Sequence, residues 1–200
     1  MTRFFQLFIS AIFHPVFVNL LSLWLLFNLF PQLKFGIPEK LKQFMILFVF
    51  ASTGIIPMVM VLVLKITGRI KSIMLHETSE RQLPYLLTML LYFFCYYNFL
   101  KLNANALVLH YLLGCTIVVM VVMFVNRFFK ISIHMASLGA LTGLIMAATK
   151  HTNEDLRLYL VMAFLISGLV ATARLYAKAH SPLQISTGFI VGLFIMFFIL

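Results

Sequence analysis

Long apolar segments separated by short polar joints constrain this chain more than any other feature of its sequence. Crossing ~30 Å of hydrocarbon takes roughly 20 apolar residues in a helix, and somewhat shorter segments also occur. Seven segments approach that length, at positions 16–33, 44–64, 84–100, 106–125, 133–148, 156–173 and 183–200. The pattern predicts an all-α protein, a polytopic transmembrane helix bundle of about seven spans, or of six if one short segment is a buried or re-entrant helix.

The composition favours a membrane protein and excludes an ordinary soluble domain. Hydrophobic residues make up 63% of the 200 residues and charged residues only 10%, and the mean hydropathy is +1.07. Five acidic residues cannot give a soluble domain of this size its charged surface. No repeat or long linker divides the chain, so we expect residues 1–200 to form a single integral membrane domain. The net charge of +10 suits anionic lipid headgroups, and no nucleic-acid-binding motif is present.

Alternation of the spans assigns the polar joints to two sides of the membrane. The second, fourth and sixth joints and the N-terminus fall on one side if there are seven spans. Prolines are favoured at the first position of a helix, and Ser is favoured as an N-cap. Such residues precede or begin four of the predicted spans on that side, namely Pro15, Pro84, Ser132, Ser181 and Pro182. Because helix N-termini carry partial positive charge, several of them together predict an anion site.

Arginine, serine and histidine side chains gather in these three joints. Arg81 precedes the third span, Ser132 and His134 precede or begin the fifth, and Arg174 and His180 precede the seventh. Arginine offers planar, permanently charged recognition of phosphate oxygens. Histidine can attack phosphorus or transfer a proton near neutral pH. Together these residue types indicate a site for a phosphate ester.

The order Arg, then Ser-x-His, then Arg-x-x-x-x-x-His resembles the type 2 phosphatidic acid phosphatase superfamily. The usual motifs of that family are K-x-x-x-x-x-x-R-P, P-S-G-H and S-R-x-x-x-x-x-H-x-x-x-D. Arg81 matches the first motif, Ser132 and His134 match the second, and Arg174 and His180 match the third with unchanged spacing. The resemblance runs from about residue 81 to 184 and implies a phosphatase-like core at approximately 70–200 in a divergent, bacterial-type member.

The sequence also departs from the family pattern at several positions. The departures are Met74 for the first-motif Lys, Pro84 in place of a Pro directly after Arg81, Ile131 and Ile133 for Pro and Gly, Ala173 for Ser, and Gln184 for Asp. In the family the Asp orients the nucleophilic His and stabilises its charged form. A neutral Gln184 can hold the ring of His180 by a hydrogen bond but offers no counter-charge.

The resemblance implies a metal-independent lipid phosphate phosphatase without a cofactor. His180 would attack phosphorus to form a phosphohistidine, His134 would protonate the leaving oxygen, and Gln184 would orient His180. The phosphate oxygens would be held by Arg81, Ser132 and Arg174. Further candidate cations are Lys71 and Lys130, either of which could replace the missing lysine, and Lys178. The implied substrates are lipid monophosphates or diphosphates, with undecaprenyl diphosphate, phosphatidate, phosphatidylglycerophosphate and lipid A all open.

Each of these residues has a simpler structural interpretation as well. His180, Arg174 and Lys178 could lie at headgroup depth and contact anionic lipid. His134 and Ser132 could serve only to start a helix, Ser181 and Gln184 could form a capping box, and Arg81 could lie in a solvated loop beside Glu77 and Glu80. A second function is therefore a catalytically silent family member that binds phosphorylated lipid. A transporter or channel would need charges inside the spans, and apart from His110 these carry almost none.

The distribution of positive charge does not fix the orientation in the membrane. Lys and Arg number nine on the motif side and six on the other side, and seven against six without Arg81 and Arg174. Resemblance to bacterial members implies a multi-pass protein of the cell (inner) membrane whose site faces the outer leaflet and the periplasm. The sequence indicates no oligomeric state.

Overall fold

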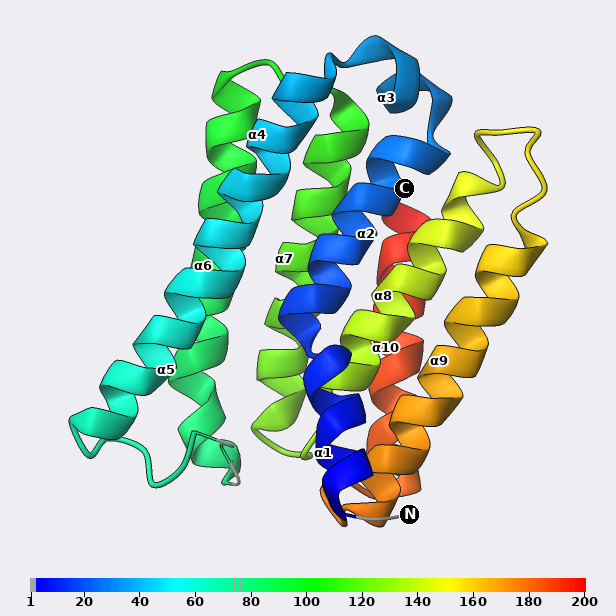
Figure 1. Ribbon diagram of the computed structural model, residues 1–200. Coiled ribbons are helices and arrows are strands. Elements are labelled where there is room, and N and C mark those ends of the chain that lie inside the picture. The colour runs from blue at the N-terminus through cyan, green and yellow to red at the C-terminus, as the bar shows by residue number, and fades with distance from the viewer. Residues whose placement is uncertain (1–2, 74, 76) are drawn as a thin grey trace.

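Every regular element in the described part of the chain is a helix. The computed structural model describes residues 3–73, 75 and 77–200. The elements are α1 (Arg3–Ile12), α2 (Pro15–Leu29), α3 (Pro31–Gly36), α4 (Glu39–Phe50), the π-helical turn η1 (Ala51–Ile55), α5 (Ile56–Ile66), α6 (Thr78–Lys101), α7 (Ala106–Asn126), α8 (Ile133–Ala148), α9 (Arg157–Tyr176) and α10 (Pro182–Ile199) (Figure 1).

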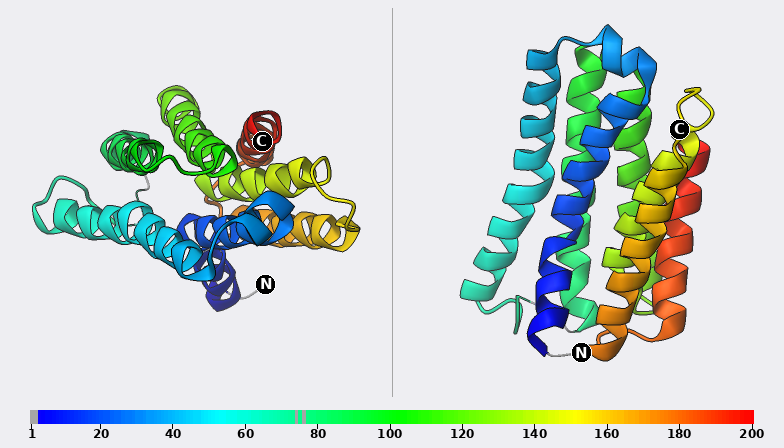
Figure 2. Two further views of the ribbon diagram at one scale, coloured as in Figure 1. Left: turned by 90° about the horizontal axis from the view of Figure 1, so that it is seen from above. Right: turned by 45° about the vertical axis from the view of Figure 1, so that its right-hand side comes forward.

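Five helices are long and apolar enough to cross a membrane. They are the continuous helix α4–η1–α5 together with α6, α7, α9 and α10. The apolar helices α2 and α8 are shorter and run alongside them (Figures 1 and 2). The prediction of an all-α bundle of membrane helices is therefore confirmed at this level, and the number of crossings stays a prediction.

The third predicted span begins earlier than its hydropathy indicates. The sequence predicts Pro84 at a helix start, but α6 begins at Thr78 and contains Pro84 in its second turn. Hydropathy marks the part of a helix that lies in hydrocarbon, whereas hydrogen bonding continues into the polar residues that precede it. Arg81 consequently lies in the first turn of α6 and is only 7% exposed. The interpretation of Arg81 as a solvated loop residue is wrong.

The first apolar helix is broken at His14. The sequence predicts a helix start at Pro15, but the residues before it also form a helix, α1, and His14 takes an extended conformation between the two helices. Pro15 has no N–H to donate, and the N–H of His14 bonds to the carbonyl of Ala11 at 3.3 Å. In an unbroken helix that N–H would bond to Ser10, so the Ser10 carbonyl is released from the helical pattern.

A polar cluster ties three helical segments together inside the apolar layer. The hydroxyl of Tyr111 on α7 donates to the backbone carbonyl of Asn19 on α2 at 3.1 Å. Asn19 Nδ2 in turn lies 3.4 Å from Thr53 Oγ1 in η1. Hydrogen bonds of this kind hold helices together where no hydrophobic driving force acts between them.

Helices α8 and α10 make the closest contact in the bundle. A Cβ added at Gly192 of α10 would overlap the carbonyl oxygen of Ala136 on α8, and one at Gly139 of α8 would overlap the carbonyl of Phe189. Small residues allow such backbone approach, and van der Waals packing then replaces the hydrophobic effect within the bilayer. The starts of α8 and α10 are therefore held side by side (Figure 1).

Replacing Gly192 with alanine tests this contact. We expect the free energy of unfolding to fall by about 1–3 kcal/mol, because the new methyl group forces α10 away from Ala136. Gly168→Ala is the matched control, since no heavy atom lies within 4 Å of a Cβ added there. Thermal unfolding of both variants in detergent micelles measures the difference. Equal stability of the two variants would contradict the close packing.

Candidate functional site

Three loops and the chain's N-terminal helix converge at one end of the bundle. The joints before α6, α8 and α10 all lie at the lower end in Figure 1, as the alternation of spans predicts. The backbone N–H of Ser132 donates to the carbonyl of Gln184 at 3.3 Å. His180 Nδ1 lies 3.3 Å from the carbonyl of Lys130. Residues that are 50 or more positions apart in the sequence are thus in direct contact.

The imidazole of His180 is buried and fixed through one nitrogen. Nδ1 lies 3.2 Å from Gln184 Oε1 as well as near the Lys130 carbonyl, and both partners are acceptors. Nδ1 therefore carries the proton, and the lone pair is on Nε2. Burial lowers the pKa of His180 to about 4, aided by the charges of Arg174 and Arg81 and opposed by the two hydrogen bonds. The ring is neutral at pH 7, as a nucleophile requires.

Gln184 both caps α10 and orients the ring of His180. Its Oε1 accepts from the backbone N–H of Ser181 at 3.1 Å, while the Ser181 hydroxyl accepts from the Gln184 N–H at 3.4 Å. This is the predicted capping box, and Pro182 occupies the first position of α10. The same oxygen contacts His180, so one side chain performs the two tasks together.

Arg81 is positioned by the end of α7 and by the loop before α6. Asn126 at the end of α7 is fully buried and donates from Nδ2 to the carbonyl of Thr78 at 3.0 Å, which fixes the first turn of α6. Arg81 Nε donates to the carbonyl of Leu75 at 2.7 Å. Tyr85 lies one turn further along α6 and is also buried. The hydrogen bond from Nε thus fixes the guanidinium of Arg81 near its attachment, and the two terminal nitrogens lie beyond it.

Three cations lie close enough to repel one another. Burial and the charges of Arg81 and Arg174 lower the pKa of Lys130, and only the exposed Glu77 opposes them. Arg174 Nε is buried without a hydrogen-bond partner among the described residues. The ion pairs among the described residues do not involve these three cations. They join Lys34 to Glu154, Glu39 to Lys42, and Asp155 to Arg157. An anion would satisfy this group of cations.

Ser132 and His134 lie at the start of α8, within the same site. Ser132 occupies the predicted N-cap position, but its hydroxyl makes no capping bond and is fully buried without a partner among the described residues. His134 Nε2 lies 3.2 Å from the carbonyl of Ser10, which the break in the first helix released. Because a carbonyl only accepts, Nε2 carries the proton. The proton of His134 is thus engaged by the backbone of α1.

His14 adds a third histidine to this end of the bundle. Its ring meets the ring of His134 edge to face, with centroids 5.5 Å apart. His14 Nδ1 accepts from the N–H of Val16 at 3.4 Å and caps α2. The sequence signal is a His-Pro pair within an apolar stretch, but only the fold places the ring against His134. Ser10 and Tyr85 carry no signal from which sequence reasoning could have found them.

Two of the candidate lysines do not join the group. The side chains of Lys71 and Lys178 are exposed. Lys178 adopts a left-handed conformation with φ of 51°, and its N–H donates to the carbonyl of Leu175 at the end of α9. Lys130 is therefore the lysine that the fold brings to the arginines. Met74, at the position of the family lysine, and His76 lie outside the described residues.

Comparison of the chain with family models, with curated proteins and with solved structures finds no match. Among the described residues, no three His, Cys, Asp or Glu side chains form a group that could hold a metal ion. The site itself offers cations, a neutral imidazole on His180 and the unpartnered hydroxyl of Ser132.

Replacing Arg174 with glutamine should raise the pKa of His180. Loss of the guanidinium charge removes a cause that disfavours the imidazolium, while burial, the largest cause, keeps the pKa below 6.5. In the wild type the pKa of His180 is about 4 in the folded state and about 6.5 in the unfolded state. Between these two values the unfolded chain binds more protons than the folded chain, so the free energy of unfolding falls as the pH drops from about 6.5 toward about 4. Titration of the imidazole by NMR in micelles measures the shift.

Arg127→Gln is the control for this titration. Arg127 is exposed in the same loop as Lys130 and is not among the causes of the His180 shift. An unchanged pKa of His180 in the Arg174 variant, or an equal rise in both variants, would show that the charge of Arg174 does not reach the ring.

Proposed function

We propose that this chain is a membrane enzyme that hydrolyses a lipid phosphate or diphosphate through a phosphohistidine on His180. The observation that carries the proposal is a neutral, oriented imidazole placed within the field of two arginines, neither of which forms an ion pair with a carboxylate in the described part of the chain. The unpartnered Ser132 hydroxyl and Arg174 Nε add donors for phosphate oxygens. The resemblance to lipid phosphate phosphatases supports the same reaction.

The proposed reaction proceeds in two displacements at phosphorus. The Nε2 lone pair of His180 forms the N–P bond while the bond from phosphorus to the leaving oxygen breaks. That oxygen takes the Nε2 proton of His134 in its imidazolium form, so a neutral imidazole is left, and the Nε2–H turns from Ser10 toward the leaving oxygen. Water then attacks phosphorus, the N–P bond breaks, and one proton of that water returns to His134. Arg81, Arg174 and Ser132 stabilise the charge that develops on the other oxygens.

The proposal includes a position in the membrane. If α1 and α2 together form one crossing and α8 another, the chain crosses the bilayer seven times. The site then lies at the boundary of one leaflet, which we place at the outer face of the cell membrane. Candidate substrates are undecaprenyl diphosphate, phosphatidate, phosphatidylglycerophosphate and lipid A.

A catalytically silent phosphorylated-lipid binder is the second candidate. Two observations favour it: Gln184 supplies no negative charge to the nucleophile, and the proton of His134 is bound to the Ser10 carbonyl. Such a protein would bind phosphatidate more tightly than phosphatidylcholine in mixed micelles, and the Arg174→Gln variant would bind the two lipids equally. It would release no phosphate.

Phosphate release by the purified protein tests the first candidate. We expect release from at least one of the four lipid phosphates and a loss of at least about 10³-fold in kcat for His180→Ala, because the nucleophile is gone. His110→Ala is the matched control, since that histidine is exposed on α7. Release no faster than in His180→Ala from every substrate would exclude hydrolysis and leave the binder.

Gln184→Asp tests the role of the orienting residue. A carboxylate in contact with Nδ1 stabilises the imidazolium that forms in the transition state, so kcat should rise by about tenfold or more. KM should rise as well, because the new charge partly neutralises Arg81 and Arg174. Gln184→Leu removes the contact altogether and should lower kcat. Equal rates for Gln184→Asp and Gln184→Leu, measured on the best lipid phosphate, would mean that Gln184 only caps α10.

A further inference from the structure

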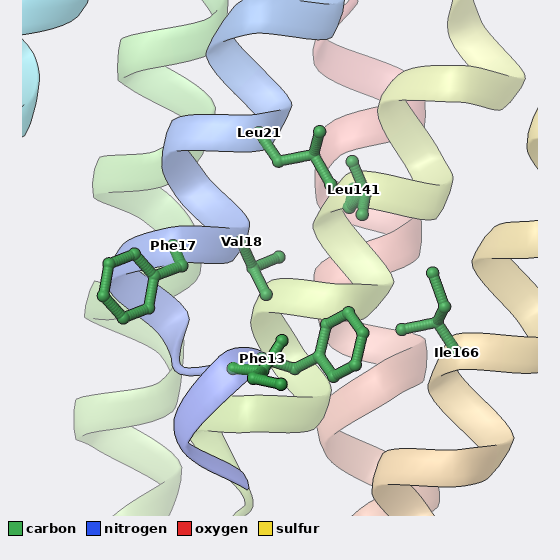
Figure 3. A pocket seen from close by; sticks show the side chains of 7 residues that line it. Phe13, Phe17, Val18, Leu21, Leu141 and Ile166 are labelled. Atoms are coloured by element: carbon green, nitrogen blue, oxygen red, sulfur yellow. The ribbon is translucent and has the colours of Figure 1, made fainter. Parts of the chain in front are cut away.

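An apolar cavity lies where the two halves of the first helix part. Its volume is about 190 Å³, and it is lined by Ile12, Phe13, Phe17, Val18, Leu21, Leu141 and Ile166. Figure 3 shows Val18 and Leu21 directed from α2 toward Leu141 on α8, with Ile166 facing them from α9. The cavity thus lies between three helices that are distant in sequence.

The break at His14 accounts for the cavity. Helix α1 packs on α9, whereas α2 packs on α8, so the chain changes partner at the break and leaves space between them. Val18 and Leu141 are 2% and 3% exposed and close the inner wall. Phe17 and Leu21 are 50% and 39% exposed, which leaves the outer side open toward the surrounding lipid.

Lining residues of the cavity lie one to two turns further along α2 and α8 than the histidine pair His14 and His134. Phe17, Val18 and Leu21 follow His14 by three, four and seven residues, and these spacings lie on one face of a helix. Leu141 follows His134 by seven residues, which is about two turns or ~10 Å along the same face of α8. Since the rings of His14 and His134 touch, both helices lead from that contact into the cavity.

We propose that this cavity binds the hydrocarbon tail of the phosphorylated lipid whose headgroup the cations hold. The inference rests on the proposed function, since it assumes an anionic headgroup at Arg81, Arg174 and Lys130. The tail of such a lipid enters from the side through the gap beside Phe17 and Leu21. A lipid without a phosphate fits the apolar walls equally well but leaves the cations without an anion. The cavity and the cations together therefore select lipids that combine a long tail with a phosphorylated end.

Ile166→Trp tests the site by filling it, and Leu165→Trp is the matched control. Leu165 is the neighbouring residue on α9, is 63% exposed and does not line the cavity. For a phosphate ester with an 18-carbon tail, we expect KM to rise at least about tenfold in Ile166→Trp only. For hexyl phosphate, KM should be the same in the wild type and both variants. An unchanged long-tail KM in Ile166→Trp would overturn the cavity as the tail site while the phosphatase proposal stands.

Photo-crosslinking gives a readout that does not depend on hydrolysis. The probe is hexadecyl phosphate with a diazirine in mid-chain, and mass spectrometry locates the labelled residues. Labelling confined to the cavity residues, weakened in Ile166→Trp and by excess unlabelled hexadecyl phosphate but not by hexadecanol, supports the inference. If this pattern appears without phosphate release from any substrate, the tail site stands and hydrolysis is excluded. Labelling spread over the lipid-facing helices, or equal competition by hexadecanol, overturns the inference.

Discussion

The backbone contact between α8 and α10 is the interaction on which the candidate site depends. Glycines at positions 139 and 192 let the two helices approach until carbonyl oxygens occupy the space of absent side chains. The helix starts are then adjacent, and Ser132 can donate to the carbonyl of Gln184. In a bilayer, where burying apolar surface gives no advantage, such packing is a main source of helix association. A wider separation would remove the contact of His180 with Lys130.

The broken first helix supplies the other half of the site. At the break the N–H of His14 bonds to Ala11 and not to Ser10, so the Ser10 carbonyl is available to accept from His134 Nε2. An unbroken helix would keep its carbonyls for itself and would present only side chains to α8. The break also turns α1 onto α9 while α2 stays on α8, so one local feature fixes a catalytic candidate and opens the neighbouring cavity.

The sequence predicted the helices and the common end of the motifs, because both follow from the bilayer. Hydrocarbon requires long apolar helices, and alternating spans require alternate joints to share a side. The capping box of Ser181 and Gln184 is local in sequence and was also predictable. The predicted helix start at Pro84 was wrong because hydropathy does not detect the polar first turn of α6, which begins at Thr78. The contact between Ser10 and His134 spans 124 positions and depends on tertiary packing, which no local pattern encodes.

The charge balance of the site bears on whether it binds or hydrolyses. A carboxylate at position 184 would partly neutralise Arg81 and Arg174 and would favour a protonated His180. The neutral Gln184 leaves the cations uncompensated, so the site favours an anion and keeps the imidazole unprotonated. A phosphate dianion would supply the missing negative charge itself and stabilise the imidazolium only while it is bound. In the proposed phosphatase, Gln184 therefore strengthens binding of the phosphate but stabilises the charged nucleophile less than a carboxylate would, so it affects both the binding step and the chemical step.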